Sequence, residues 1–129
     1  MNNLNSVLLE GVMVRKPMFR ITVKEKVVCN FTIVSNRMYQ EEDHTIVKEV
    51  SFFDIETWGT LAKACGKIGK KGCGVRVVGR LKQERWTGTD GKTHSKMIVE
   101  AEHVEFRPDL KGRVSEAEGD AEEETGYNE

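Results

Sequence analysis

Aromatic rings and basic side chains alternate along the middle of this sequence. The rings expected on loops or strand surfaces are those of Tyr39, Phe52, Trp58 and Trp86. The basic residues interleaved with them are Lys48, Lys70, Lys71, Lys82 and Arg85. Aromatic faces stack on unpaired nucleobases for roughly 1–3 kcal/mol each, whatever the base, while Lys and Arg neutralise phosphates. This combination predicts an interface for single-stranded nucleic acid.

Each ring also has an alternative role in the core. The adjacent Phe52 and Phe53 point to opposite faces of a strand, and the pattern leaves open which of the two is buried. Trp58 falls on the apolar side of a predicted helix, where a core position is the more frequent outcome. Trp86 precedes a Gly-rich turn and Tyr39 lies in an acidic stretch, so both rings are hard to bury.

The charged residues near these rings also have two interpretations. Glu41, Glu42 and Asp43 would repel phosphate beside Tyr39, so we expect them at a solvated loop tip. Lys70 and Lys71 follow the predicted helix, where bases either cap free carbonyls or contact a nucleic-acid backbone. The sequence favours neither role for this pair.

No motif for catalysis or metal binding occurs in the sequence. It contains no nucleophile elbow, phosphate-binding loop, zinc-protease motif or Gly-rich dinucleotide signature. A pair formed by Cys65 with His44 or His103 is not constrained by spacing. Three sparse cysteines without CxxC spacing are typical of reduced, buried thiols rather than of disulfides or zinc ligands. We therefore expect no enzyme activity, no metal and no cofactor.

Length and charge divide the chain into a body and a tail. Its 129 residues, 38% of them hydrophobic, fit one domain, expected over residues 1–107, and a tail over residues 108–129. Residues 1–113 carry 20 basic and 14 acidic residues, a charge of +6, whereas residues 114–129 carry seven acidic and no basic residues, a charge of −7. Such a segment buries too little apolar surface to fold, so we expect a disordered acidic tail that competes with nucleic acid for the basic body.

The sequence shows no membrane span and no secretory signal. No apolar run approaches the roughly 20 residues that cross a bilayer. The first residues lack a basic stretch followed by a long apolar segment and a cleavage site. We expect a cytoplasmic protein.

Alternating apolar and polar residues predict mostly strands. Strands are expected over residues 5–14, 19–34, 45–55, 74–86 and 96–106. Residues 35–44 are polar and are expected to form a long loop, residues 57–65 a short helix, and Asp90-Gly91 a hairpin turn. Five strands with one helix between the third and fourth predict an all-β chain folded as an oligonucleotide-binding (OB) Greek-key barrel.

Four stretches of this chain resemble the bacterial-type single-stranded DNA-binding protein family, and the likeness covers roughly residues 3–106. They are NSVLLEG from Asn5, VCNFTIV from Val28, SFFDIETWGTLA from Ser51 and VGRLKQERW from Val78. The resemblance implies a homotetramer of OB barrels that binds single-stranded DNA in replication, recombination and repair. It also implies base stacking at Tyr39, Phe52, Trp58 and Trp86, and phosphate contacts at Lys70, Lys71, Lys82 and Arg85.

The chain departs from this family at three places. Glu84 and Asp54 stand where many relatives carry Arg, which implies weaker phosphate binding. The region between Gly11 and Val27 lacks the usual Gly-Asn and Asp-Pro-Glu residues, so we expect an altered first hairpin. The tail lacks the apolar Ile-Pro-Phe tip, so recruitment of repair and replication proteins is not expected. Single-stranded RNA binding and a protein-interaction adaptor that has lost its groove are the two alternatives.

Overall fold

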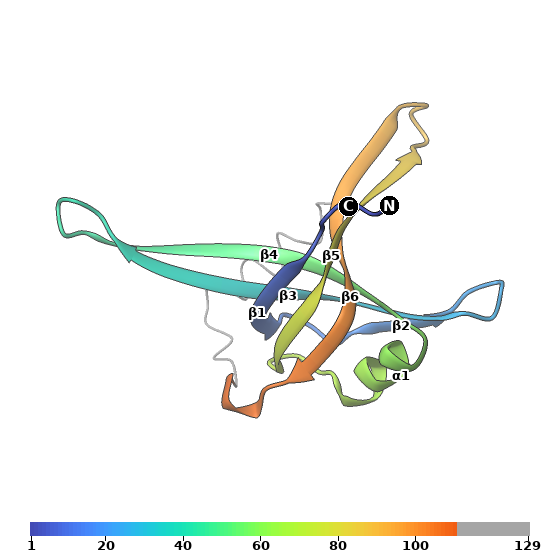
Figure 1. Ribbon diagram of the computed structural model, residues 1–129, viewed down its shortest axis with the longest axis horizontal. Coiled ribbons are helices and arrows are strands. Elements are labelled where there is room, and N and C mark those ends of the chain that lie inside the picture. Colours follow the sequence, from blue (N-terminus) through green and yellow to red (C-terminus); the bar gives the residue numbers. More distant parts are fainter. Residues whose placement is uncertain (111–129) are drawn as a thin grey trace.

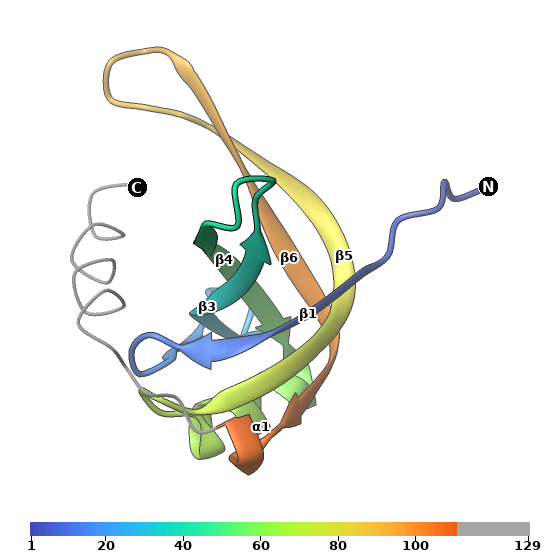
Figure 2. The same cartoon turned by 90° about the vertical axis from the view of Figure 1, so that its left-hand side faces the viewer.

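A computed structural model describes residues 1–110 of the chain. Its elements are β1 (Val7–Met13), β2 (Met18–Ile21), β3 (Val27–Gln40), β4 (Ile46–Trp58), α1 (Gly59–Ile68), β5 (Gly74–Thr87), β6 (Thr93–Phe106) and the 3₁₀ helix η1 (Pro108–Leu110). The strands follow the order β1-β5-β6-β4-β3, and pairing of β1 with β3 closes the ring, as Figure 2 shows. The predicted OB barrel with one helix is confirmed.

Three hairpins project from the barrel as two-stranded arms, formed by β2–β3, β3–β4 and β5–β6 (Figure 1). The β5–β6 arm turns at Asp90-Gly91, as the sequence predicts, and Gly91 has a φ of 78° that favours glycine. The β3–β4 and β2–β3 arms differ most from the predicted strands and loops.

The loop predicted over residues 35–44 is confirmed for residues 41–44 and wrong for residues 35–40, because β3 continues to Gln40. Its last residues pair with β4 without interruption, from Ser35 opposite Ser51 to Gln40 opposite Ile46. Residues 36–40 are all exposed, so their polar composition reflects water on both faces of the ribbon rather than an absence of strand. The second predicted strand is also two strands, since β2 folds back on β3 through a turn at residues 22–26.

Odd-numbered residues in the barrel portions of β3, β4 and β5, together with Val99 and Ala101 of β6, fill the barrel. Ile33, Ile55, Val77 and Val99 are at most 3% exposed, so the even-numbered residues beside them point outward. Burial raises the pKa of the Cys65 thiol to about 11 and raises the pKa of Cys29 above its ordinary value. Both thiols are therefore protonated near neutral pH and pack as apolar groups.

The folded body extends three residues beyond the predicted boundary at 107. Pro108–Leu110 form η1, and the Arg107 N–H donates to the Gly74 carbonyl oxygen over 2.8 Å. The remainder of the predicted acidic tail, residues 111–129, lies outside the described residues. Over residues 1–110, no helix has both the length and the apolar content for a transmembrane span.

Candidate nucleic-acid interface

Strand register places three of the four predicted rings on one outer surface of the barrel. We call this surface the groove face and define it by the outward residues Asn30, Thr32, Phe52, Asp54, Glu56, Trp58, Lys82, Glu84, Trp86, Lys96 and Ile98. Asn30 pairs with Glu56 and Thr32 with Asp54 across β3 and β4. Lys82 pairs with Ile98 and Glu84 with Lys96 across β5 and β6. The parallel pairing of β4 with β6 joins these two halves into one surface.

Phe52 lies beside a cavity of about 260 Å³ in the groove face. The lining includes Asn30 and Thr32 from β3, Asp54 from β4, and Lys96 from β6. The neighbouring Phe53 packs against the hydrophobic core, which decides the ambiguity that alternation left open. Phe52 is therefore the member of the pair that a ligand in this cavity would contact.

Trp86 lies on the β5–β6 arm and is 41% exposed. Its ring stacks on His94 of the opposite strand, with centroids 5.8 Å apart and planes inclined by 24°. Asp90 accepts the Lys92 backbone N–H over 2.9 Å and lies 3.2 Å from His94 Nε2. Those two contacts hold the pKa of Asp90 below its ordinary value. The turn thus fixes His94 beneath one side of Trp86 and leaves the indole partly open to water.

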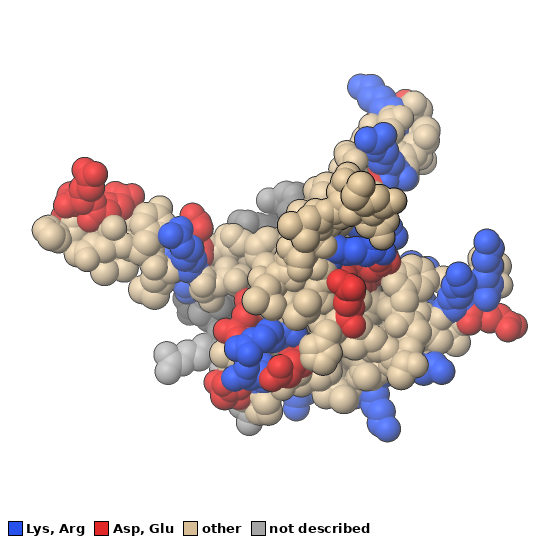
Figure 3. Space-filling model, viewed as in Figure 1, with Lys and Arg blue, Asp and Glu red and all other residues tan. Residues whose placement is uncertain are grey.

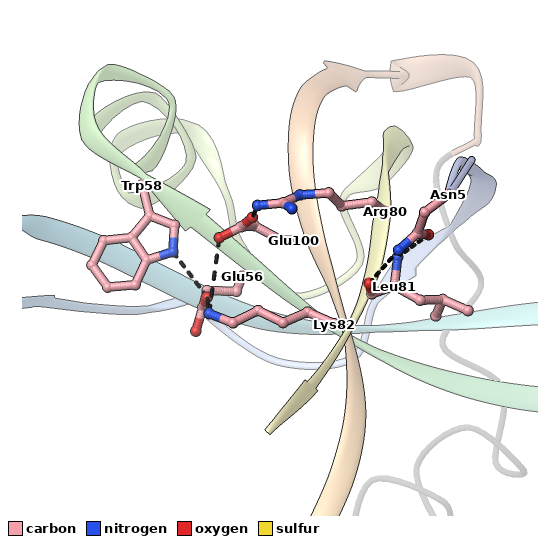
Figure 4. A network of polar contacts seen from close by, with 7 residues as sticks. All are labelled: Asn5, Glu56, Trp58, Arg80, Leu81, Lys82 and Glu100. Atoms are coloured by element: carbon pink, nitrogen blue, oxygen red, sulfur yellow. Dashed lines mark hydrogen bonds and ion pairs between the residues drawn. The ribbon is translucent and has the colours of Figure 1, made fainter. Parts of the chain in front are cut away.

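Trp58 does not lie on the apolar helical face that the sequence predicts for it. It is the last residue of β4, and α1 begins at Gly59, whose φ of 64° turns the chain between strand and helix. Its indole N–H donates to Glu56 Oε1 over 2.8 Å, as Figure 4 shows. The half-buried ring therefore belongs to the edge of the groove face.

Lys82 is held by carboxylates within the groove face. Its Nζ lies 3.4 Å from Glu56 Oε1 and 4.0 Å from Glu100 Oε1. Glu100 also bonds Arg80, which completes the network in Figure 4. Glu56 is only 5% exposed, so Lys82 supplies the positive charge that such a buried carboxylate needs.

Tyr39 lies on the opposite face of the β3–β4 arm from Phe52. It pairs with Val47, and this odd-numbered position continues the inward row of Ile33 along the arm. The ring is 36% exposed, and the Arg37 guanidinium lies 5.2 Å from its centroid. Acidic side chains gather at the tip of this arm in Figure 3, where Glu41, Glu42 and Asp43 form the adjoining loop.

The remaining predicted bases do not converge on one place. Lys48 is exposed on the β3–β4 arm and shares the outward row of Phe52. Arg85 points to the opposite face of β5 from Trp86, and its guanidinium donates to Gln83 Oε1 over 3.2 Å. Lys70 and Lys71 precede β5, whereas Trp86 lies near its other end. At about 3.3 Å per residue, the backbone of β5 from Gly74 to Trp86 is roughly 40 Å long, so these lysines lie near the opposite end of the strand from Trp86.

Sequence reasoning named Asp54 but missed Lys96 of β6 and Glu56 of β4. Lys96 lines the Phe52 cavity, and its Nζ lies 4.0 Å from Asp54 Oδ2. Asp54 also accepts the Thr32 hydroxyl hydrogen over 2.8 Å. The cross-strand register of β5 and β6 would have pointed to Lys96, since it brings that residue opposite Glu84. Over residues 1–110, no group of three or more His, Cys, Asp and Glu side chains has the arrangement of a metal site.

A family profile and individual relatives place this chain among the same group of proteins. The profile of the Single-strand binding protein family matches residues 4–107. Single-stranded DNA-binding protein 2 of Chlorobaculum tepidum is 29% identical over 123 residues, which are 95% of this chain and 81% of that protein. The Single-stranded DNA-binding protein of Aquifex aeolicus is 35% identical over 119 residues, which are 92% of this chain and 80% of that protein.

Two solved structures share the fold. The Plasmodium falciparum SSB in complex with ssDNA superimposes with a TM-score of 0.75 at 17% identity, covering 83% of this chain and 97% of that one. A deletion mutant of the single-stranded DNA binding protein from Thermus aquaticus gives a TM-score of 0.73 at 24% identity, covering 86% of this chain and 52% of that one.

Proposed function

This chain belongs to the single-strand binding protein family, and we propose that it binds single-stranded DNA through the groove face, without strong sequence preference. Phe52 and Trp86 would stack on bases, with Trp58 at the edge of the same surface. Lys48 and Lys82 share the outward rows of these rings and would contact phosphates. Tyr39, Arg85, Lys70 and Lys71 would contact DNA only where it leaves this surface.

The observation that carries this proposal is the open position of two rings on one charged surface. Phe52 borders a cavity that also contains Lys96, and Trp86 borders a second cavity that again contains Lys96. A base can lie on each ring while its phosphate meets a nearby cation. A duplex reader would instead present a recognition helix to the major groove, and α1 packs its buried side chains Ala62 and Cys65 against the barrel.

We also propose a non-catalytic, cytoplasmic role in protecting single strands during replication, recombination and repair. The support is the kinship with proteins named for single-stranded DNA binding. The groove lysines face carboxylates, so phosphates must displace ion pairs that already exist. This competition supports a weaker affinity than a purely basic groove would give.

Titration of labelled oligothymidylate into the full chain tests the function. Single strands are expected to bind, duplexes of the same length to bind weakly, and log affinity to fall by about 0.7 per log salt for each phosphate neutralised. Equal affinity for both forms would indicate only a cationic surface. No binding at low salt would favour the adaptor alternative, and tighter binding of matched RNA would favour the RNA alternative.

We further propose that the chain assembles as a homotetramer, as its family resemblance implies. Leu8 is 71% exposed on the outer face of β1, and Leu81 and Met97 are 45% and 54% exposed on β5 and β6. Burial of such side chains between copies would remove apolar surface from water. Light scattering on the full chain is expected to give the mass of four copies, and a monomer mass across the micromolar range would reject the tetramer.

A further inference from the structure

Glu84 lies between the two rings that the proposed function assigns to base stacking. Its side chain lines the cavity beside Phe52 and also lines the cavity beside Trp86. Lys96, opposite Glu84 on the neighbouring strand, lines the same two cavities. A strand of DNA that passes from one ring to the other must therefore run beside the Glu84 carboxylate.

The carboxylates that line the Phe52 cavity differ in what they already bind. Asp54 accepts the Thr32 hydroxyl hydrogen and faces Lys96. Glu56 accepts the Trp58 indole N–H and faces Lys82. The Glu84 carboxylate makes no hydrogen bond or ion pair with any side chain in the 1–110 range, and the residue is half-buried. It is thus the carboxylate of this cavity that keeps its acceptor oxygens available.

We propose that Glu84 gives the groove face a preference for bases that carry an exocyclic amino group, through a hydrogen bond from that amino group to its carboxylate. The inference rests on the proposed function, because it concerns bases already held by stacking. Cytosine presents its N4 amino group as a donor that Glu or Asp accepts, whereas thymine presents the O4 oxygen at the same position. The single ring N–H of thymine lies between two carbonyl oxygens, which repel a carboxylate.

The preference is expected to be modest. A hydrogen bond to a charged group is stronger than one between neutral groups when it is shielded from water. Glu84 is only half-buried, and its charge also repels the phosphates. We therefore expect oligodeoxycytidylate to bind about three- to tenfold more tightly than oligothymidylate of equal length, which remains compatible with coating of mixed sequences.

Affinities for these two oligomers, measured at pH 8 where cytosine is neutral, test the inference in the wild-type chain and in Glu84→Gln. The amide is isosteric but uncharged and can also donate to thymine O4. The substitution is expected to raise affinity for oligothymidylate and to bring the ratio of the two affinities close to one. Glu105→Gln, which removes the same charge from an exposed position near the far end of β6, is the matched control and is expected to keep the wild-type ratio.

Each outcome distinguishes this inference from the proposed function. Clear binding of both oligomers with equal affinity in the wild type overturns the role of Glu84 and leaves DNA binding intact. A cytosine preference that survives Glu84→Gln also overturns it, because stacking would then be the cause. Absence of binding to either oligomer rejects the proposed function and the inference together.

Discussion

Replacing Trp86 with alanine is expected to weaken binding of oligothymidylate by about 5- to 150-fold, the equivalent of roughly 1–3 kcal/mol. The indole is 41% exposed on an arm that projects from the barrel, so its removal leaves the core intact. His94 stacks beside it and retains one smaller ring after the substitution, which favours the lower part of this range. Fluorescence anisotropy of a labelled oligomer measures the change.

Trp86→Phe provides the matched control for this experiment. It keeps an aromatic face at the same position and is expected to remain within about threefold of the wild type. Thermal unfolding of both variants should match that of the wild type, because neither change touches a buried side chain. Unchanged DNA affinity in Trp86→Ala would exclude this ring from the interface.

Ile33→Ala is expected to lower the free energy of unfolding by about 2–5 kcal/mol, the usual cost of deleting a large buried aliphatic side chain. Ile33 is 0% exposed. It pairs with Met13 of β1 and with Phe53 of β4. The side chain therefore lies where β1 closes the ring onto β3, and a cavity there loosens the closure as well as the core.

Ile46→Ala deletes the same atoms from a position that is 62% exposed near the tip of the β3–β4 arm. Its effect is expected to stay within about 0.5 kcal/mol. Urea unfolding at one fixed protein concentration compares the two variants, since assembly would couple stability to concentration. Equal midpoints for both would show that the barrel interior does not depend on Ile33.

Local alternation was sufficient to predict the barrel. Apolar residues at every second position predict the buried faces of β3 and β5, and the helical spacing from Leu61 to Cys65 predicts the buried face of α1 between β4 and β5. The same reasoning did not predict a strand over residues 35–40. Both faces of this ribbon contact water, so its sequence lacks the apolar and polar alternation that identifies a half-buried strand. Trp58 was misplaced for a different reason: one glycine, Gly59, moves the start of the helix past it.

The candidate site was harder to predict than the fold, because it depends on register between distant strands. Phe52, Trp58 and Trp86 share a surface only because β4 pairs in parallel with β6 at Ile55 and Val99. No local pattern encodes that pairing. For the same reason the sequence did not point to Lys96, did not place Glu84 between the two rings, and did not show on which face of the arm Tyr39 lies.

The hairpin arms of this molecule are expected to bend more easily than the barrel. Residues 36–40 of the β3–β4 arm are exposed throughout, so bending that ribbon transfers little apolar area into water. The ring of five strands, by contrast, cannot deform without disturbing its close-packed interior. When a flexible strand of nucleic acid binds along different paths, the arms are therefore expected to bend to fit it, while the barrel keeps its shape.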